Sequence, residues 1–121
     1  VICYCGDNNF VHPYKFAEAA KKYPNAKFIM AHAGILFMTS HSIEVCTEND
    51  NCYIEISNIN ACVINDAKNK GVLNKVLFGT DTPFNYFDAM KACVETALSD
   101  EKEKEMVYSG NFLKMMEDIQ V

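Results

Sequence analysis

Short apolar runs alternate with helix-like stretches along the whole chain. Four runs are rich in apolar residues and have the length of strands: residues 1–5 (VICYC), 26–32 (AKFIMAH), 52–57 (CYIEIS) and 74–79 (NKVLFG). Between and after them, apolar residues recur every three or four positions, as on one face of a helix. We expect helices at residues 13–23, 40–48, 59–70 and 84–98, with a last one at 111–119. The pattern therefore predicts four β-α units in tandem.

Several local signals set the expected ends of these helices. Ser40 or Ser42 is a suitable N-cap for the second helix, and Gly71 ends the third. The charged run at residues 100–105 reads as a solvated helix start. The fourth helix is expected to present one apolar face, made of Phe84, Phe87, Met90, Val94 and Leu98.

Tandem β-α units indicate an α/β fold with a parallel sheet, because a helical crossover is needed to return the chain to the next parallel strand. Two architectures fit the length. One is half of a (β/α)₈ barrel, since a full barrel takes ~250 residues. The other is an open doubly wound sheet, which normally carries a Gly-rich phosphate loop after its first strand. Residues 5–10 contain a single Gly, so the half barrel, with strands matching five to eight, is favoured.

The composition excludes several classes of protein. The 121 residues carry 11 Lys+Arg against 16 Asp+Glu, for a formal net charge of −5, and 50% of them are hydrophobic. This apolar content supports a packed core and excludes a disordered chain. The acidic balance argues against a nucleic-acid partner. No apolar run approaches the ~20 residues that span a bilayer, so no membrane partner is expected.

Six cysteines are spread along the chain, mostly inside apolar runs: Cys3, Cys5, Cys46, Cys52, Cys62 and Cys93. No two of them form a Cys-x-x-Cys pair, which argues against a structural zinc site of that kind. We expect most to be reduced and buried, in a cytoplasmic protein. Because residue 1 is a Val inside an apolar run, we expect residues 1–121 to form a single partial barrel domain of a longer chain.

Polar residues that end the predicted strands are the candidates for chemistry, because sites in parallel β-α folds form at this edge of the sheet. His32 ends the second run, and Asp81 follows the fourth. Side chains alternate along a strand. The alternation predicts three groups that share a face: Phe28, Met30 and His32; Glu55 and Ser57; and Leu77, Gly79 and Asp81. If these faces line a barrel, His32, Ser57 and Asp81 meet at its mouth.

Each of these residues also has a purely structural interpretation. Asp81 precedes Thr-Pro-Phe and could cap the helix that follows. His32 could be a structural histidine at a strand end, and Ser57 a turn residue.

Four segments together resemble a known family: FIMAHAG, NCYIEISN, GVLNKVLFGTDTPF and YSGNFLKMM. They look like the second half of the amidohydrolase-related TIM-barrel family of metal-dependent hydrolases and decarboxylases. Members of that family end in a Gly-Ser/Thr-Asp-x-Pro strand and a helix that begins Gly-Asn. The resemblance covers essentially the whole chain.

The resemblance implies roles for particular residues. Asp81 matches a metal ligand that also acts as base toward the attacking water. His32 matches a residue that is a metal ligand or a substrate-facing acid–base group. Ser57 and Tyr4 are expected to contact a small organic substrate. The implied cofactor is a divalent metal, with zinc the expected ion.

The chain departs from the family pattern in two ways. The fifth strand of metal-binding members ends in His, where this chain has Tyr4, a poor ligand for such a metal. The His-x-His pair of the first strand has no counterpart. Because a catalytic zinc site needs about three protein ligands, His32 and Asp81 predict weak metal binding and an inactive chain when it is alone.

Two functions follow from this incomplete ligand set. The chain is either the C-terminal half of a metal-dependent hydrolase or a non-catalytic half-barrel used for binding or assembly. In both, we expect self-association or pairing with the missing half, because an open sheet leaves strand edges unpaired.

Overall fold

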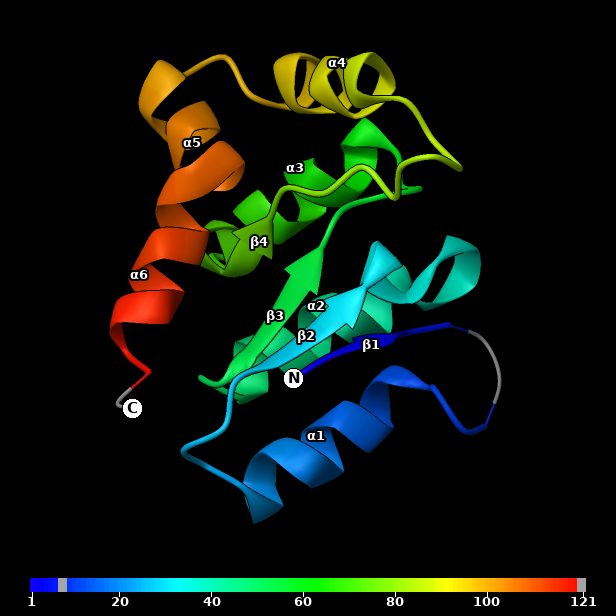
Figure 1. Ribbon diagram of the computed structural model, residues 1–121, viewed down its shortest axis with the longest axis vertical. Helices are drawn as coiled ribbons and strands as arrows, with labels where there is room; N and C mark the ends of the chain where they lie inside the picture. Colours follow the sequence, from blue (N-terminus) through cyan, green and yellow to red (C-terminus); the bar gives the residue numbers. More distant parts are fainter. Residues whose placement is uncertain (7–8, 120–121) are drawn as a thin grey trace.

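A computed structural model describes residues 1–6 and 9–119, and it contains the four expected β-α units (Figure 1). The four strands are parallel, and their order in the sheet is β1-β2-β3-β4. They span Ile2–Tyr4 (β1), Phe28–Ala31 (β2), Cys52–Glu55 (β3) and Val76–Leu77 (β4). Each strand lies inside the apolar run that predicted it, so the strand assignments are confirmed.

The α-helices follow the strands as expected. They span Pro13–Lys22 (α1), Thr39–Glu48 (α2), Ala61–Asn69 (α3), Phe87–Ala97 (α4), Glu101–Glu105 (α5) and Asn111–Glu117 (α6). Short helical turns occupy His32–Gly34 (η1), Leu36–Met38 (η2), Leu73–Lys75 (η3) and Met106–Gly110 (η4). None of the helices in the described ranges is both long and apolar enough to cross a membrane.

The helix ends confirm some of the local signals and correct others. The charged run begins α5, where the Asp100 carboxylate accepts from two backbone N–H groups. Gly71, with a φ of 75°, follows α3 as expected. The prediction of a serine cap for α2 is wrong. That helix begins at Thr39, no side chain caps it, and Ser42 is buried inside it.

The apolar face expected of the fourth helix is only partly present. Met90, Val94 and Leu98 are buried in the main core. Phe84 is 86% exposed, because it lies in a turn closed by the backbone carbonyl of Asp81, and α4 begins only at Phe87. The loop after β4 is therefore longer than the apolar spacing indicated.

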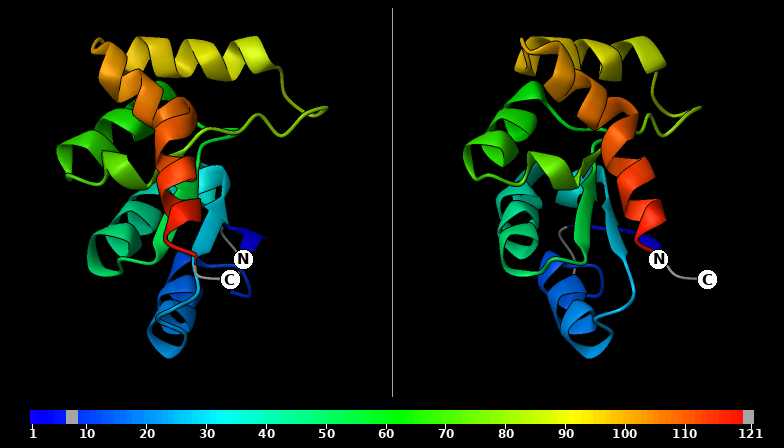
Figure 2. Two further views of the ribbon diagram at one scale, coloured as in Figure 1. Left: turned by 60° about the vertical axis from the view of Figure 1, so that its left-hand side comes forward. Right: turned by 90° about the vertical axis from the view of Figure 1, so that its left-hand side faces the viewer.

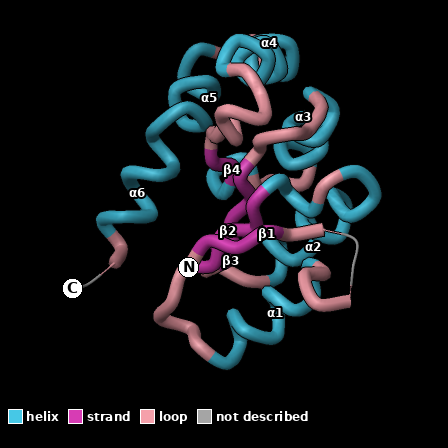
Figure 3. Tube along the Cα trace, turned by 45° about the vertical axis from the view of Figure 1, so that its right-hand side comes forward, coloured by secondary structure: helices cyan, strands magenta, loops and turns pink. Residues whose placement is uncertain are grey.

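One face of the sheet packs against α1, α2 and α3, and α6 lies on the other side (Figures 2 and 3). Met30, Ile54 and Val76 pair across three strands and belong to the main core with the helices. Leu77 and Tyr53 belong instead to a second cluster, which Met115 of α6 covers. Burying side chains of this size contributes roughly 1.5–3 kcal/mol each.

These two clusters correct the expected alternation in β2. Phe28 and Met30 face the helices, so they do not point into the barrel interior as expected. The regular alternation ends at Ala31, because His32 has a φ of 62° and its side chain turns toward β3. The expected face of Leu77 does lie away from the main core.

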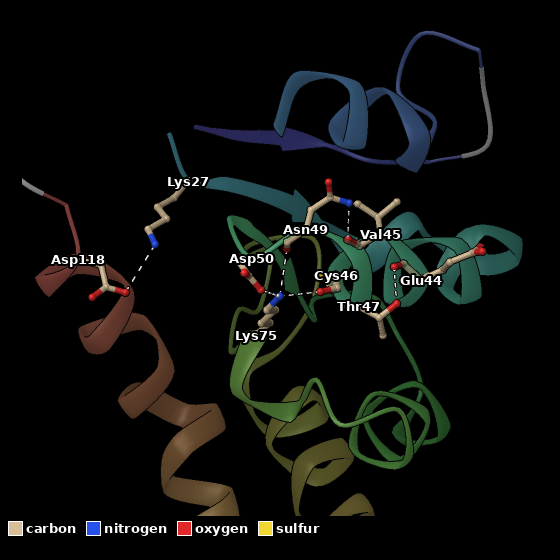
Figure 4. A network of polar contacts seen from close by, with 9 residues as sticks. All are labelled: Lys27, Glu44, Val45, Cys46, Thr47, Asn49, Asp50, Lys75 and Asp118. Carbon is tan, nitrogen blue, oxygen red and sulfur yellow. Dashed lines mark hydrogen bonds and ion pairs between the residues drawn. The ribbon is translucent and has the colours of Figure 1, made fainter. Parts of the chain in front are cut away.

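At the amino ends of the strands, two lysines make polar contacts that join neighbouring elements. The ammonium of Lys75 donates to the carbonyls of Cys46 and Asn49 at 2.6 and 3.1 Å, at the C-terminal end of α2 (Figure 4). Lys27 forms an ion pair with Asp118, which follows α6, at 3.6 Å. In parallel β-α folds this edge carries stability, while the opposite edge carries function.

Candidate functional site

Three side chains from the ends of β2 and β3 form one hydrogen-bonded cluster. The Nδ1 atom of His32 lies 2.7 Å from the Ser57 hydroxyl oxygen. That hydroxyl donates to Oε2 of Glu55 at 2.7 Å. The other carboxylate oxygen, Oε1, accepts from the backbone N–H of Ser57 at 2.7 Å, and Oε2 also accepts from the backbone N–H of His32 at 3.2 Å. Both carboxylate oxygens of Glu55 thus accept hydrogen bonds within the cluster.

Asp81 lies at the same edge of the sheet, joined to this cluster by the next residue along the chain. Its Oδ2 atom accepts from the amide of Asn58 at 2.8 Å, and the Asn58 carbonyl accepts from Asn85 at 3.3 Å. His32 and Asp81 are thus bridged by the consecutive residues Ser57 and Asn58. Asp81 does not cap α4, because that helix begins at Phe87. Its backbone carbonyl instead closes the turn that follows.

The backbone is left-handed at the residue of each strand end that carries a polar side chain. The φ angles are 62° for His32, 60° for Asn58 and 56° for Asp81. Such conformations cost about 1–2 kcal/mol per residue for most side chains, although Asn and Asp tolerate them better. Strained residues of this kind cluster at functional sites in proteins. All non-Gly residues with positive φ in the described ranges lie in the segments that follow β2, β3 and β4.

Gly79 makes room for the carboxylate of Glu55. A Cβ atom at Gly79 would overlap the Glu55 side chain. The glycine two residues before Asp81 therefore lets β3 and the end of β4 approach with a glutamate between them. This close approach gives a physical reason for a glycine at this point of the strand.

Tyr4 stands beside the cluster. Its ring packs against the His32 ring, with centroids 5.6 Å apart in an edge-on arrangement. Tyr4 pairs with Ala31 in the sheet and is 47% exposed. Tyr4 thus lies beside His32, and its expected contact with a substrate stays a prediction.

Among the described residues, the donors in this region do not make a complete metal centre. No group of three His, Cys, Asp or Glu side chains in residues 1–6 and 9–119 converges to hold a metal ion. Glu55 is occupied by its three N–H and O–H donors, and Tyr4 stands where a His ligand was expected. The side chains present fit a partial ligand set at most.

The sequence predicts that His32, Ser57 and Asp81 lie close together. It does not predict that Glu55 and Asn58 connect them by hydrogen bonds. The alternation of side chains predicts only that Glu55 shares a face with Ser57. Its position in an Ile-Glu-Ile-Ser run is the available signal, because a carboxylate inside an apolar strand is buried only with partners.

A cavity of about 250 Å³ lies at the opposite, amino-end edge and does not include the strand-end cluster. It lies between the strands and α6. Its lining includes Lys27, Lys75 and Met115. Lys27 and Lys75 are held in the contacts shown in Figure 4, so we assign this cavity a structural role at the amino ends of the strands.

The cysteines lie apart from this chemistry. All six are free thiols, and Cys5, Cys46 and Cys52 are buried as expected. Burial raises the pKa of Cys5 and Cys52 to about 11, which makes their thiols poor nucleophiles. Cys3 and Cys62 are exposed, contrary to the expectation for most of the six.

Comparison with known proteins agrees with this fold. The structure resembles an uncharacterised TIM-barrel protein from Bordetella bronchiseptica, with a TM-score of 0.81 and 17% identity over 98% of this chain and 46% of that one. It also resembles a dihydroxybenzoic acid decarboxylase from a Polaromonas species, solved with bound manganese and the inhibitor 2-nitroresorcinol. The TM-score is 0.66 and the identity 21%, over 92% of this chain and 40% of that one.

A 5-carboxyvanillate decarboxylase from Sphingomonas paucimobilis gives a TM-score of 0.63 and 16% identity, over 84% of this chain and 36% of that one. The chain thus spans less than half of each of these TIM barrels, which makes its four parallel β-α units a half barrel. No curated protein matches the sequence.

The class of protein follows from this fold and from the sequence itself. A profile described as Amidohydrolase matches residues 9–115, which is most of the chain. The chain belongs to the amidohydrolase family.

Proposed function

We propose that this chain is the C-terminal half of a metal-dependent amidohydrolase-family enzyme acting on a small organic acid. The main observation in support is that His32 and Asp81 lie at the same end of a parallel sheet and are bridged by Ser57 and Asn58. In half barrels and full barrels alike, this is the edge from which chemistry is expected. Membership of the amidohydrolase family also supports the proposal.

We favour decarboxylation as the reaction and keep hydrolysis as the alternative. Two of the structures with this fold are named as decarboxylases of dihydroxybenzoic acid and 5-carboxyvanillate, although identities near 20% support the fold alone. In a decarboxylation the carbon–carboxylate bond breaks, carbon dioxide leaves with no net charge, and a proton replaces it on the carbon. His32 is the group in this cluster suited to give that proton, because histidine is the side chain that most often acts as a general acid in enzymes. In a hydrolysis the same imidazole would protonate the leaving group.

This chain supplies only part of the metal-ligand set that the proposal requires. His32 and Asp81 would be two ligands of a larger set, and the other ligands would come from the missing half of the barrel. Such a metal supplies Lewis-acid polarisation of the substrate's oxygen atoms. Manganese is bound in one related structure, and zinc stays a prediction from the sequence.

The test is turnover by the protein as its gene encodes it, with 2,6-dihydroxybenzoate and 5-carboxyvanillate as probes and with manganese or zinc supplied. Loss of Asp81 by Asp81→Asn is expected to reduce turnover at least a hundredfold. The matched control is Asp88→Asn, which removes an exposed carboxylate from the first turn of α4 and should leave turnover unchanged. Unchanged turnover in Asp81→Asn would reject the role of Asp81. Release of carbon dioxide separates decarboxylation from hydrolysis.

A non-catalytic half-barrel is the second candidate, and the incomplete donor set favours it. If it is correct, the complete gene product binds manganese and zinc no more tightly than its Asp81→Asn variant does. Calorimetric titration of both proteins with each metal distinguishes the two candidates.

A further inference from the structure

We propose that Glu55, acting through the hydroxyl of Ser57, keeps Nδ1 of His32 protonated, so that Nε2 is the nitrogen this imidazole offers to a substrate or metal. The placement of the protons stands on hydrogen bonds alone. Only the role of Nε2 rests on the proposed function.

The first step concerns the single proton of the Ser57 hydroxyl. An ionised carboxylate can only accept hydrogen bonds, and Ser57 donates to Oε2 of Glu55 at 2.7 Å. Once that proton is committed, the hydroxyl oxygen can act toward His32 only as an acceptor. The 2.7 Å contact with Nδ1 of His32 therefore requires the ring nitrogen to be the donor.

The second step concerns the ring of His32. A neutral imidazole carries one proton, so a protonated Nδ1 leaves the lone pair on Nε2. In the charged imidazolium both nitrogens are protonated, and Nδ1 keeps the same bond to Ser57. In both forms Nδ1 is occupied by its bond to Ser57, so Nε2 is the nitrogen left for another partner.

The third step concerns how firmly the arrangement is held. Ser57 is 2% exposed, and Glu55 is fixed by backbone N–H groups of both Ser57 and His32. Gly79 leaves the space that the carboxylate fills. Buried hydrogen-bonded groups of this kind orient a histidine and fix its tautomer, which makes Glu55 and Ser57 positioning residues. The hydroxyl of Ser57 makes both of these bonds, and the substrate contact expected of Ser57 stays a prediction.

His12 provides an internal reference with the opposite tautomer. Its Nδ1 atom accepts from the backbone N–H of Tyr14 at 3.3 Å, where it caps α1. A neutral His12 must therefore carry its proton on Nε2. The same chain thus holds one histidine in each form.

The test is the pattern of ring-nitrogen signals in a long-range ¹H–¹⁵N correlation spectrum of the 121-residue chain. The measurement is made at about pH 8, above the ordinary imidazole pKa of ~6.5. His32→Asn identifies the His32 signals by their loss. We expect His32 to show a protonated Nδ1 and His12 a protonated Nε2. A protonated Nε2 on His32 in the wild-type spectrum overturns the proposal.

Variants then test the part played by Glu55. In Glu55→Gln the new amide can donate to the Ser57 hydroxyl, which frees that hydroxyl to donate to Nδ1, so His32 should switch to the Nε2-protonated form. Ser57→Ala removes the acceptor and should reduce the Nδ1-protonated fraction. Glu44→Gln is the control, because Glu44 is exposed and contacts Tyr14, close to the other two histidines. It should leave His32 unchanged.

A folded Glu55→Gln variant with an unchanged His32 pattern overturns the role of Glu55. If Glu55→Gln does not fold, which circular dichroism shows, the same outcome in Ser57→Ala overturns the role of the Ser57 hydroxyl. In the complete gene product, Glu55→Gln is expected to reduce kcat by 10–100-fold. The expected spectrum together with an inactive wild-type protein rejects the proposed function and leaves the proton arrangement standing.

Discussion

Left-handed backbone conformations at His32, Asn58 and Asp81 connect local geometry with the candidate site. Each follows a different strand, and each turns a polar side chain into the same hydrogen-bonded region. The residue types at two of these points could be anticipated, because strand ends of parallel folds carry chemistry. The positive φ of His32 could not be, since strand alternation assumes extended backbone, and this is why the expected face of β2 was wrong.

The conformation of Asp81 predicts an unusual order of stability among its variants. Because its φ is 56°, Asp81→Gly should be about 1 kcal/mol more stable than Asp81→Ala, although both lose the carboxylate. Chemical denaturation measures the difference. Asp66, inside α3, is the control, where Gly should be less stable than Ala by roughly the same amount. Equal stability of the two Asp81 variants would contradict the left-handed conformation.

The thiols should divide into two groups by their reactivity. Cys3 and Cys62 are exposed, whereas Cys5, Cys46 and Cys52 are buried. Burial raises the pKa of Cys5 to about 11, so its thiol is almost wholly protonated at pH 8. Mass spectrometry after brief alkylation with iodoacetamide at pH 8 should show rapid labelling of Cys3 and Cys62, with the buried three labelled only after unfolding. Rapid labelling of Cys46 in the folded chain would contradict the packing of α2.

At the scale of elements, the strands and long helices were predictable, while the packing of the C-terminal helix was not. Apolar runs of this length predict strands, so β1 to β4 follow from the pattern alone, although β1 is exposed along its whole length. The position of α6 depends instead on Asn111, a buried residue whose amide donates to the carbonyls of Leu73 and Val76 at 2.8 Å each. Such long-range contacts leave no periodic signal in a sequence. These bonds tie the start of α6 to the start of β4.

Removal of the Asn111 amide should therefore weaken the attachment of α6. Asn111→Ala leaves two carbonyls of the η3–β4 segment without their partner and is expected to destabilise the fold by about 1–3 kcal/mol. Urea denaturation measures this free energy. Asn74→Ala, at an exposed position of η3, should change it by roughly 0.5 kcal/mol or less. A similar effect of both substitutions would show that α6 does not depend on the Asn111 amide.

At the scale of the molecule, the two outer strands of the sheet, β1 and β4, differ in how they are covered. The backbone of Phe78, just after β4, donates to the carbonyl of Val107 in η4, and its ring packs against Tyr108, so the C-terminal segment approaches that edge. At the other edge, Ile2 of β1 is 61% exposed. Exposed apolar strands at a sheet edge favour pairing with another chain or segment.

The exposed β1 edge predicts association of the chain with itself when it is isolated. Sedimentation velocity should show a sedimentation coefficient that rises with protein concentration. Ile2→Lys should reduce this rise, because a charged side chain at a strand edge opposes pairing. Leu113→Lys is the control, since it places the same charge on an exposed apolar position of α6. A concentration-independent monomer in the wild type would contradict the prediction.

The absent side chain at Gly79 has a consequence that reaches beyond the turn in which it lies. An added methyl group there would displace Glu55, although it would alter no acid, base or hydrogen-bonding group itself. A variant such as Gly79→Ala could thus keep every reactive atom of the chain and still lose the direction in which its imidazole faces. Inactivating changes in this protein should for that reason include silent-looking increases in bulk, as well as losses of charge.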